Sequence, residues 1–453
     1  MRPLKATLCA GLLTATALVC AGTPASAAVT HTTGTLADGT TWIADVPSDW
    51  NGTLLLYSHG FGTLTAADAP DPTTAAALLA RGYALAGSSY DPNGSLWALN
   101  TAVRDQFDSL RAVEKTALPR TARYVYAVGT SMGGLVSALE DQDGAGRIDG
   151  TLTTCGLVAG AINLNNYQLD GEYALAQLLL PGQQVQLVRF ASAGAALATA
   201  TTLQAAAATA QQTAAGRARL ALAMAFLNAE DGLATPVLPD PATLETDQYQ
   251  AEFTGAFSTL DFLESARPSI EQAAGGNGSW TAGVNFAAVL DRSPYRGEVA
   301  ELYRAAGLSL RGDLGDLTRN ADITADPAAI RSLEETSVPT GHLTVPELDL
   351  HTISDQLIPV QQENYYARQV RESGSGQLLR QAYVASVGHC DFSSAELVAG
   401  VLALSHRVMT GRWDAAAEPS SLNQVAASLN LGPARFIDYR PGPLTGEVTV
   451  RAR

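Results

Sequence analysis

The chain has 453 residues, of which 46% are hydrophobic and 16% charged, so it can form one large globular domain or two to three smaller ones. Acidic residues outnumber basic ones by 44 to 28, and the formal net charge of -16 disfavours binding to nucleic acid or to an anionic membrane. The 4 cysteines and 6 histidines form no cluster at zinc-site spacing. We therefore expect a soluble acidic protein without a structural metal.

Residues 1–27 have the parts of a secretion signal. Two basic residues precede an apolar run from residue 6 to about residue 19, and Ala25-Ser26-Ala27 is a small-x-small cleavage site. The run is too short and too rich in Ala, Gly and Thr for a transmembrane helix. Cys20 leaves a lipid-anchored form as the alternative, although Val19 suits lipidation of the next residue poorly. We expect free secretion, with a net charge of -18 after cleavage, from 28 − 2 = 26 basic and 44 acidic residues.

The first predicted strands lead into a glycine-rich loop. Residues 40–47 and 53–58 show the alternation or clustering of apolar residues that is typical of β-strands. The second run continues directly into His59-Gly60-Phe61-Gly62. Such a bend can turn a backbone N–H toward a nucleophile, and an ordinary exit from a strand is the alternative. In both cases we interpret His59 as a structural residue that hydrogen-bonds the loop.

Helices and strands alternate over the next hundred residues. The predicted elements are a helix over 73–81, a strand over 83–90, an amphipathic helix over 97–114 and a buried strand over 150–160 that contains Cys155. Helices between strands at this spacing form βαβ units, which predict a mostly parallel sheet.

Residues 123–134 carry a catalytic motif. A β-type run ends in Gly129-Thr130-Ser131-Met132-Gly133 and a helical pattern follows, so G-x-S-x-G has the strand–turn–helix context that it requires. We expect this sharp turn to strain the backbone of Ser131, with Gly129 and Gly133 leaving room for it. Ser131 is therefore the candidate nucleophile, exposed at the positive end of a helix.

Residues 163–340 differ in composition from what precedes them. Ala, Leu and Gln dominate, and helices are predicted over 193–210, 216–227 and 254–267. A segment of this length without strands is typical of a helical cap rather than a loop. If the cap covers the mouth of the sheet, small apolar side chains of residues 193–227 would line an acyl pocket.

The α/β pattern resumes near residue 345 and places two polar residues after strands. The predicted elements are a strand over 347–355 that ends at Asp355, a helix over 361–370, a strand over 378–384 and a helix over 393–408. Gly388-His389-Cys390 lies between the last two. The core would thus consist of residues 28–162 and 341–415, followed by an irregular tail over 416–453.

Ser131, Asp355 and His389 occur in the order nucleophile, acid, base. With this order and with the motif around Ser131, the chain resembles the α/β-hydrolase family of serine hydrolases. The resemblance implies an α/β-hydrolase fold in which His389 activates Ser131 and Asp355 orients the imidazole. It also implies an oxyanion hole made by the backbone N–H groups of Phe61 and Met132.

Other residues compete for these roles. Asp355 could instead be a carboxylate that caps its loop. Asp349 lies within a strand pattern, and Asp391 is too close in sequence to the catalytic histidine to reach its far nitrogen. We interpret His351 and His406 as structural, because they lie in strand and helix patterns.

The segment Gly388-His389-Cys390 also resembles tannases and feruloyl esterases, in which the cysteine after the histidine bonds one immediately before the nucleophile. Here Thr130 precedes the nucleophile, so that bridge cannot form. After signal cleavage Cys155 and Cys390 are the only cysteines left, and secretion would place both in an oxidising compartment. We predict a disulfide between them that pins the loop of the histidine, with two buried free thiols as the alternative.

These patterns together predict a secreted α/β-hydrolase with a helical cap that cleaves carboxylic esters, small or polymeric. We expect a monomer that needs no metal and no organic cofactor. An aminopeptidase is the alternative within enzymes, in which Glu230, Asp231 or Glu245 would hold a free amine. A non-catalytic binding protein on the same scaffold is the third hypothesis, and the intact order of the three catalytic residue types argues against it.

Overall fold

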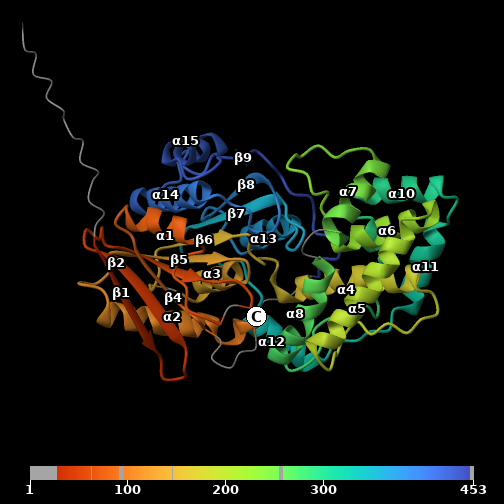
Figure 1. Cartoon of the computed structure of the whole chain (residues 1–453), viewed down its shortest axis with the longest axis horizontal. Coiled ribbons are helices and arrows are strands. Elements are labelled where there is room, and N and C mark those ends of the chain that lie inside the picture. The colour runs from red at the N-terminus through yellow and green to blue at the C-terminus, as the bar shows by residue number, and fades with distance from the viewer. Residues whose placement is uncertain (1–27, 63, 91–95, 145, 255–258, 449–453) are drawn as a thin grey trace, which may run out of the picture.

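The computed structural model describes residues 28–62, 64–90, 96–144, 146–254 and 259–448. Figure 1 shows a twisted sheet with flanking helices in one half of the molecule and a group of helices in the other. The predicted signal segment, residues 1–27, lies outside the described residues. Within the described part, none of the helices has the length and apolar character needed to span a lipid bilayer.

The nine strands of the described chain form one sheet in the order β1-β2-β4-β3-β5-β6-β7-β8-β9. Strands β3 to β8 run parallel to one another, whereas β1, β2 and β9 pair antiparallel with their neighbours. This order, with a serine turn after β5, is that of the α/β-hydrolase fold, so the predicted fold class is confirmed. The strands are β1 (Val29–Thr35), β2 (Thr41–Pro47), β3 (Thr53–Ser58), β4 (Ala84–Ser88), β5 (Tyr124–Thr130), β6 (Gly150–Thr154), β7 (Glu347–Ser354), β8 (Leu379–Val387) and β9 (Phe436–Ile437).

Helices cover both faces of the parallel strands. Successive side chains of a strand point to opposite faces, so Leu55 packs with α1 and α14, whereas Leu54 and Leu56 pack with α2. A strand that is buried on both faces has a nearly continuous run of apolar residues. Strand β3 is of this kind, because all six of its residues are buried. The helices of the core are α1 (Pro72–Leu79), η1 (Ala98–Asn100), α2 (Ala102–Thr116), α3 (Met132–Asp143), α13 (Gln361–Glu372) and α14 (Ser394–Thr410).

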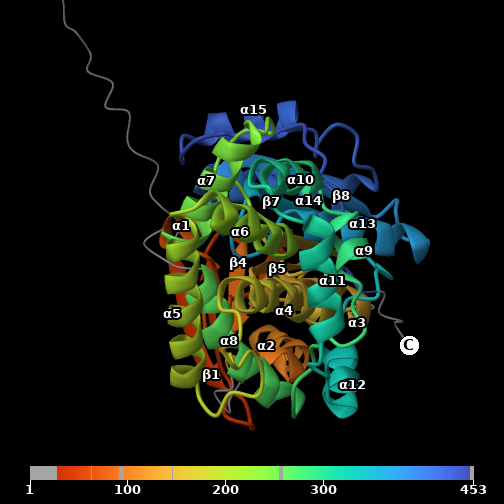
Figure 2. The same cartoon turned by 90° about the vertical axis from the view of Figure 1, so that its right-hand side faces the viewer.

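The chain between β6 and β7 is helical. Its helix α4 is buried along nearly its whole length, and Figure 2 shows it in the middle of this half of the molecule, with α5, α6, α8 and α11 around it. Small alanine side chains of α5 and α6 let these helices pack closely against α4. The helices are α4 (Gly160–Leu179), α5 (Ala193–Ala210), α6 (Ala214–Leu227), α7 (Pro241–Phe253), α8 (Thr259–Ala274), α9 (Phe286–Leu290), α10 (Arg296–Ala305), α11 (Leu310–Asn320) and α12 (Pro327–Thr336). We call residues 160–336 the helical insertion.

Some element boundaries differ from the sequence predictions. The predicted strand over 150–160 ends already at Thr154, because Cys155 adopts a left-handed backbone with φ 44° that breaks the ladder. The helix predicted over 254–267 is displaced to Thr259–Ala274 and continues through Pro268, a residue that normally disfavours a helix interior. The edge strand β1 was not predicted, because its Thr-rich and mostly exposed residues lack an apolar face.

The C-terminal tail is not irregular throughout, which corrects the prediction for residues 416–453. It contains α15 (Pro419–Leu429) and β9, which pairs with β8. Further on, the tail bonds the helical insertion: the Asn228 side chain bonds both the N–H and the C=O of Thr445, and Asn163 accepts a hydrogen bond from the N–H of Val448. Partners this distant in sequence leave no local signal that could reveal them.

Candidate active site

Ser131 lies in a strained turn between β5 and α3. Its backbone has φ 60° and ψ −123°, in the region that L-residues avoid. The neighbouring glycines are required sterically: a Cβ on Gly129 would lie 1.9 Å from the carbonyl oxygen of Gly133, and a Cβ on Gly133 would lie 1.9 Å from that of Ser58. The G-x-S-x-G spacing therefore fixes a serine that projects from the end of the strand.

The structure brings Ser131, His389 and Asp355 together. The Nε2 atom of His389 lies 2.7 Å from the Ser131 Oγ, and its Nδ1 lies 2.8 Å from the Asp355 Oδ2. A carboxylate only accepts hydrogen bonds, so Nδ1 carries the proton and Nε2 is left to accept from the serine hydroxyl. Asp355 follows β7 and His389 follows β8, so the parallel strands deliver both residues to the same edge of the sheet as Ser131.

Asp355 is fully buried and fixed by its own loop. Its Oδ1 accepts hydrogen bonds from the N–H groups of Leu357 at 3.0 Å and of Ile358 at 2.8 Å. Burial by itself would raise the pKa of this carboxyl, but the charge and hydrogen bond of His389, with further contributions from His351 and Ile358, hold it below its usual value. Asp355 is therefore the ionised member of the group.

The other two candidate acids have different surroundings. Asp349 is buried within β7, where burial raises its pKa well above the usual range. Asp391 accepts hydrogen bonds from Ser386 and Arg435. The carboxylate that hydrogen-bonds the His389 Nδ1 is that of Asp355, so geometry selects Asp355.

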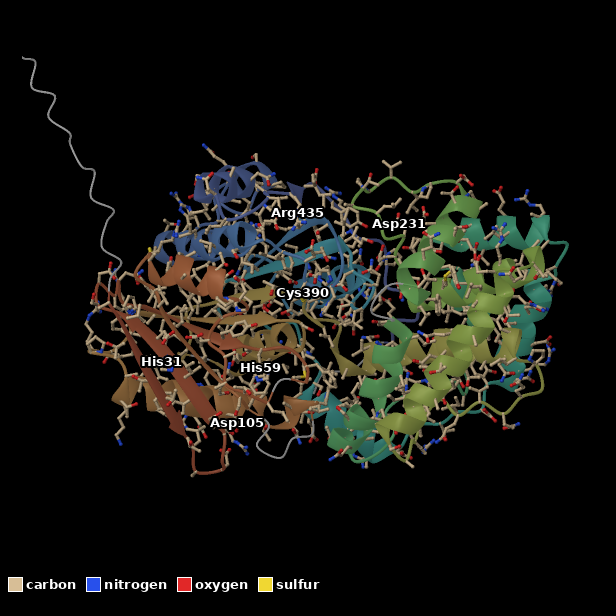
Figure 3. The ribbon with its side chains drawn as sticks, viewed as in Figure 1. His31, His59, Asp105, Asp231, Cys390 and Arg435 are labelled. Atoms are coloured by element: carbon tan, nitrogen blue, oxygen red, sulfur yellow. A yellow bond between two sulfur atoms is a disulfide. The ribbon has the colours of Figure 1, made fainter. Side chains whose placement is uncertain are left out.

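Cys155 and Cys390 form a disulfide with a Cα–Cα distance of 5.3 Å, as the sequence predicted. Thr154 pairs with Thr130 across the sheet, so Cys155 leaves β6 beside the nucleophile turn. Figure 3 shows Cys390 near the middle of the molecule, where the sheet meets the helical insertion. The bridge thus ties the loop of His389 to the strand next to the serine.

The disulfide also bears on metal binding. The donor atoms of Cys155, His389 and Cys390 lie within 4.8 Å of one another. Both sulfurs are consumed by the bridge, however, and a metal ligand must be a free thiolate. This group is therefore not a metal site while the disulfide is intact.

A small, narrow cavity adjoins Ser131. Among the described residues that line it, Ser131, Gln168 and Trp97 carry hydrogen-bonding side-chain groups, and the others are apolar or aromatic. The other lining residues are Phe61, Met132, Leu157, Leu164, Ala266, Ile270, Leu357 and Ile358. The insertion contributes to this lining through α4 and α8, so residues 193–227, which we expected to line the pocket, are not part of it.

The two predicted oxyanion donors border this cavity. Met132 is the first residue of α3, where a helix N–H has no acceptor within its own helix. Phe61 belongs to the loop that abuts the serine, since a Cβ built on Gly60 would lie 3.8 Å from the Ser131 Oγ. Both residues therefore border the space beside the Ser131 hydroxyl.

His59 has a structural place in that loop. Its Nδ1 lies 2.8 Å from the carbonyl oxygen of Gly60 and its Nε2 lies 3.1 Å from that of Ser89. The ring stacks on Tyr90 with 3.9 Å between centroids. His59 therefore fastens the glycine-rich loop to the end of β4.

The carboxylates considered for binding a free amine do not border the cavity. Glu230 accepts a hydrogen bond from Gln361 at 2.8 Å, and burial raises its pKa to about 8. Asp231, labelled in Figure 3, caps a turn by accepting from the N–H of Leu233, and Glu245 accepts from Gln211. These groups serve the packing of the insertion.

Sequence reasoning missed most of the cavity lining. Trp97, Gln168 and Ile270 come from three separate segments, and each sits in an otherwise ordinary helical or loop pattern. Gln168 offered the one usable signal, because it is a buried amide within the long apolar stretch of α4. Their convergence depends on how the insertion folds back onto the core, which no local pattern encodes.

Comparisons with known proteins give one relative across most of the chain. No family model matches. The chain is 28% identical over 447 residues to the o-phthalyl amidase of Xanthobacter agilis, and the match covers 90% of this chain and 94% of that protein.

Among solved structures, similar ones include an esterase from Aspergillus oryzae (TM-score 0.39, 15% identity, covering 82% of this chain and 77% of that one) and feruloyl esterase B from the same organism (TM-score 0.39, 15%, 84% and 80%). The rice cell wall degrading esterase LipA from Xanthomonas oryzae is similar at a TM-score of 0.37, with 13% identity over 84% of this chain and 87% of that one. Such TM-scores are too low to support an inference, and the fold assignment rests on the strand order and the serine turn.

Proposed function

We propose that the protein is a serine hydrolase that cleaves a carboxylic ester through an acyl-enzyme on Ser131. The observation that carries the proposal is the continuous hydrogen-bonded chain from Ser131 through His389 to Asp355, with 2.7 Å and 2.8 Å between its atoms. In serine hydrolases this arrangement makes a neutral hydroxyl nucleophilic by giving its proton a nearby base.

The proposed cycle uses only groups of the chain and water. The Ser131 Oγ attacks the carbonyl carbon while its proton passes to His389 Nε2, and Asp355 stabilises the imidazolium that forms. The N–H groups of Phe61 and Met132 donate to the tetrahedral oxyanion. His389 then gives its proton to the departing alcohol. Water, deprotonated by the same imidazole, attacks the acyl-enzyme, and the acid leaves as Ser131 recovers its proton.

Amide hydrolysis is the second candidate, favoured by the relative named o-phthalyl amidase, which aligns with nearly the whole chain. An amide of an aryl acid would use the same three residues, with an amine as the leaving group. An aminopeptidase is less well supported, because Glu230, Asp231 and Glu245 lie away from the cavity lining. Secretion stays part of the proposal, since a disulfide persists best in an oxidising compartment.

The deciding experiment compares leaving groups on matched acyl groups. Purified protein is assayed with p-nitrophenyl esters, p-nitroanilides of the same acids, a phthalyl amide and aminoacyl p-nitroanilides, with Ser131→Ala as the control. Turnover of esters alone supports the esterase, turnover of the simple anilides or the phthalyl amide supports the amidase, and turnover confined to aminoacyl anilides supports the aminopeptidase. A fluorophosphonate that labels a residue other than Ser131, or none, would overturn the proposal.

A further inference from the structure

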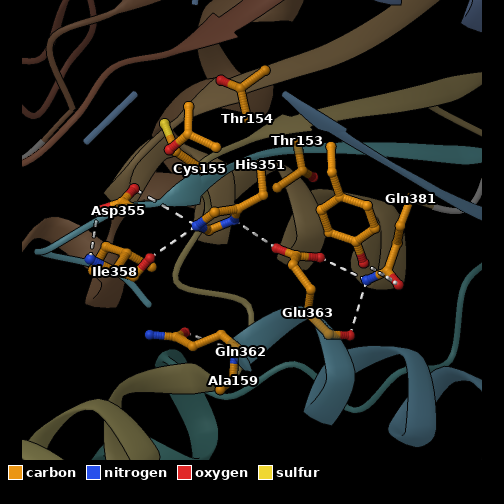
Figure 4. Close-up of polar contacts among 12 residues, drawn as sticks. Thr153, Thr154, Cys155, Ala159, His351, Asp355, Ile358, Gln362, Glu363 and Gln381 are labelled. Atoms are coloured by element: carbon orange, nitrogen blue, oxygen red, sulfur yellow. Dashed lines mark hydrogen bonds and ion pairs between the residues drawn. The ribbon is translucent and has the colours of Figure 1, made fainter. Parts of the chain in front are cut away.

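A buried imidazole, that of His351, lies on the other side of Asp355 from His389. His351, on β7, is fully buried, and Figure 4 shows its ring between Asp355 and Glu363. The His351 Nε2 lies 2.9 Å from the carbonyl oxygen of Ile358 and 3.6 Å from the Asp355 Oδ2, the oxygen that also accepts from His389. The acidic oxygen of the candidate site therefore has an imidazole on each side.

Geometry fixes the proton on the inner imidazole. A carbonyl oxygen can only accept a hydrogen bond, so the contact with Ile358 requires that the His351 Nε2 carries a hydrogen. The opposite atom, Nδ1, lies 2.8 Å from the Glu363 Oε1. Whether the shared proton sits on Nδ1 or on Glu363, the pair is neutral as a whole and Nε2 still points an N–H toward Asp355 and Ile358.

Glu363 is itself held in place from the neighbouring strand. Its Oε2 and its backbone carbonyl both accept from the Gln381 amide, at 2.6 Å and 2.9 Å, which ties α13 to β8. Burial raises the pKa of Glu363 to about 7, with a smaller rise from Glu347. Asp349 also faces it, and burial keeps the pKa of that carboxyl well above its usual range. A proton shared with His351 thus spares the interior an isolated charge.

Ile358 links His351 to Asp355 through two hydrogen bonds. The N–H of Ile358 donates to the Asp355 Oδ1 at 2.8 Å, while its carbonyl accepts from His351. The residue that anchors one carboxylate oxygen is therefore anchored by the imidazole that faces the other. His351 therefore faces one oxygen of Asp355 at 3.6 Å and supports the other through the hydrogen bonds of Ile358.

We propose that His351, held by Glu363, is a positioning residue that keeps the Asp355 carboxylate aimed at His389. This inference rests on the proposed function, because it assigns His351 a part in orienting the same site. Sequence reasoning treats His351 as structural only. The two roles differ in what they predict: a structural residue affects the folded fraction, whereas a positioning residue lowers kcat of protein that is fully folded.

The test compares His351→Leu with His351→Gln in the full chain, using the best substrate from the panel above. His351→Leu removes the hydrogen bond to the Ile358 carbonyl and the imidazole that faces the Asp355 carboxylate at 3.6 Å, so we expect it to lower kcat by about 10- to 100-fold with KM within about twofold. His351→Gln places an amide N–H near the position of Nε2 and should recover most of the rate. Equal activity of the folded Leu variant and wild type would overturn the proposal.

A matched control separates this effect from general damage to the region. Tyr366→Phe removes a buried hydrogen bond of 2.9 Å to Glu347, on the same helix as Glu363 but outside the chain that leads to Asp355. We expect a lower melting temperature with unchanged kcat. A fall in kcat equal to that of His351→Leu would show that any lesion in this layer slows the enzyme, and would also overturn the proposal.

A double-mutant cycle and a labelling experiment complete the test. If His351 acts through Asp355, adding His351→Leu to the Asp355→Asn variant should lower kcat little further. If the two residues act independently, the fold-decreases in kcat of the two single variants should multiply in the double variant. Fluorophosphonate labelling of the wild type tests the nucleophile separately. No labelling of the wild type refutes the proposed function, and rapid labelling of the wild type with equal labelling of His351→Leu refutes only the positioning role.

Discussion

At the scale of single residues, the candidate site combines backbone strain with hydrogen bonding. Ser131 occupies a backbone conformation that costs on the order of 1–3 kcal/mol, and such strain persists only where the surroundings determine it. Here Gly129 and Gly133 admit backbone contacts that no side chain would allow. The strain is thus tied to the placement of one hydroxyl 2.7 Å from an imidazole.

The first prediction concerns the reacting group itself. Ser131→Ala should fold normally and lower the chemical step by about 10⁶-fold, because the acyl-enzyme cannot form. Asp355→Asn should lower kcat by about 10⁴-fold, because the amide stabilises the wrong tautomer of His389. Steady-state kinetics with circular dichroism as the control for folding measures both. A Ser131→Ala protein that retains more than a thousandth of the wild-type rate would contradict the assignment.

The three candidate catalytic residues could be predicted from the sequence, because their chemistry restricts which residue types can occur at these positions. Ser131, Asp355 and His389 were predicted by number, because the motif restricts residue types at fixed spacing around the serine and after the strands. For His351 the sequence predicted only a structural role within a strand. Its contacts with Ile358 and Glu363 depend on the path of the loop after β7, which the sequence pattern does not specify.

At the scale of elements, the order of the strands places the three candidate catalytic residues at one edge of the sheet. The disulfide then holds the loop of His389 against the neighbouring strand. The bridge joins the ends of two loops 235 residues apart in sequence, and it encloses the whole helical insertion. The parallel strand β3, with its strong apolar run, was predicted to the residue, and the other parallel strands that were predicted differ at one or both ends. Edge strands, the course of α8 and the tail were not, because tertiary contacts decide them.

We predict that the double variant Cys155→Ala/Cys390→Ala is less stable and less active than the wild type. The chain-entropy account gives about 5 kcal/mol for so long a loop as an upper value, and bridges commonly contribute about 2–4 kcal/mol. Denaturant unfolding measures the loss. Because Cys390 follows His389 directly, kcat should also fall, and a variant with unchanged kcat and unchanged stability would show that the bridge does not fasten the histidine loop.

A second prediction at this scale concerns the wall that α8 gives to the cavity. Ala266→Leu should reduce the space beside Ser131 and shift preference toward shorter acyl groups, because Ala266 borders the cavity. Ala208→Leu, on the exposed side of α5, is the matched control and should leave the preference unchanged. The measurement is kcat/KM over p-nitrophenyl esters of increasing chain length. Identical profiles for the two variants would place the acyl group elsewhere.

At the scale of the whole molecule, an acidic protein keeps many of its carboxyl groups in the interior. Burial raises the pKa of Glu230 and of Glu298 to about 8 and that of Glu363 to about 7. Composition gives the net charge of -16, but it does not reveal which acids are buried, because burial follows from the tertiary packing of both the core and the insertion. Acid–base behaviour is therefore a property of the folded chain.

The last prediction follows from the sign of these shifts. A carboxyl whose pKa is raised by folding keeps its proton in the native state between pH 4.5 and about 8, while the unfolded chain releases it. Its contribution to stability is complete below pH 4.5 and is lost as the pH rises to about 8. Each group of this kind contributes a slope of about 1.4 kcal/mol per pH unit at most. We therefore expect the melting temperature to fall steadily from pH 5 to pH 8.5.

Glu298 offers a direct check, because it is 5% exposed and both of its carboxyl oxygens lack a hydrogen-bond partner within the described residues. Glu298→Gln removes the titration without changing the shape of the side chain, so the variant should match the wild type near pH 5 and exceed it at pH 8. Glu301→Gln, at an exposed position on the same helix, is the control and should leave the slope unchanged. Calorimetric melting temperatures at several pH values measure the difference. Parallel curves for Glu298→Gln and wild type would mean that this carboxyl is already ionised in the folded protein at neutral pH.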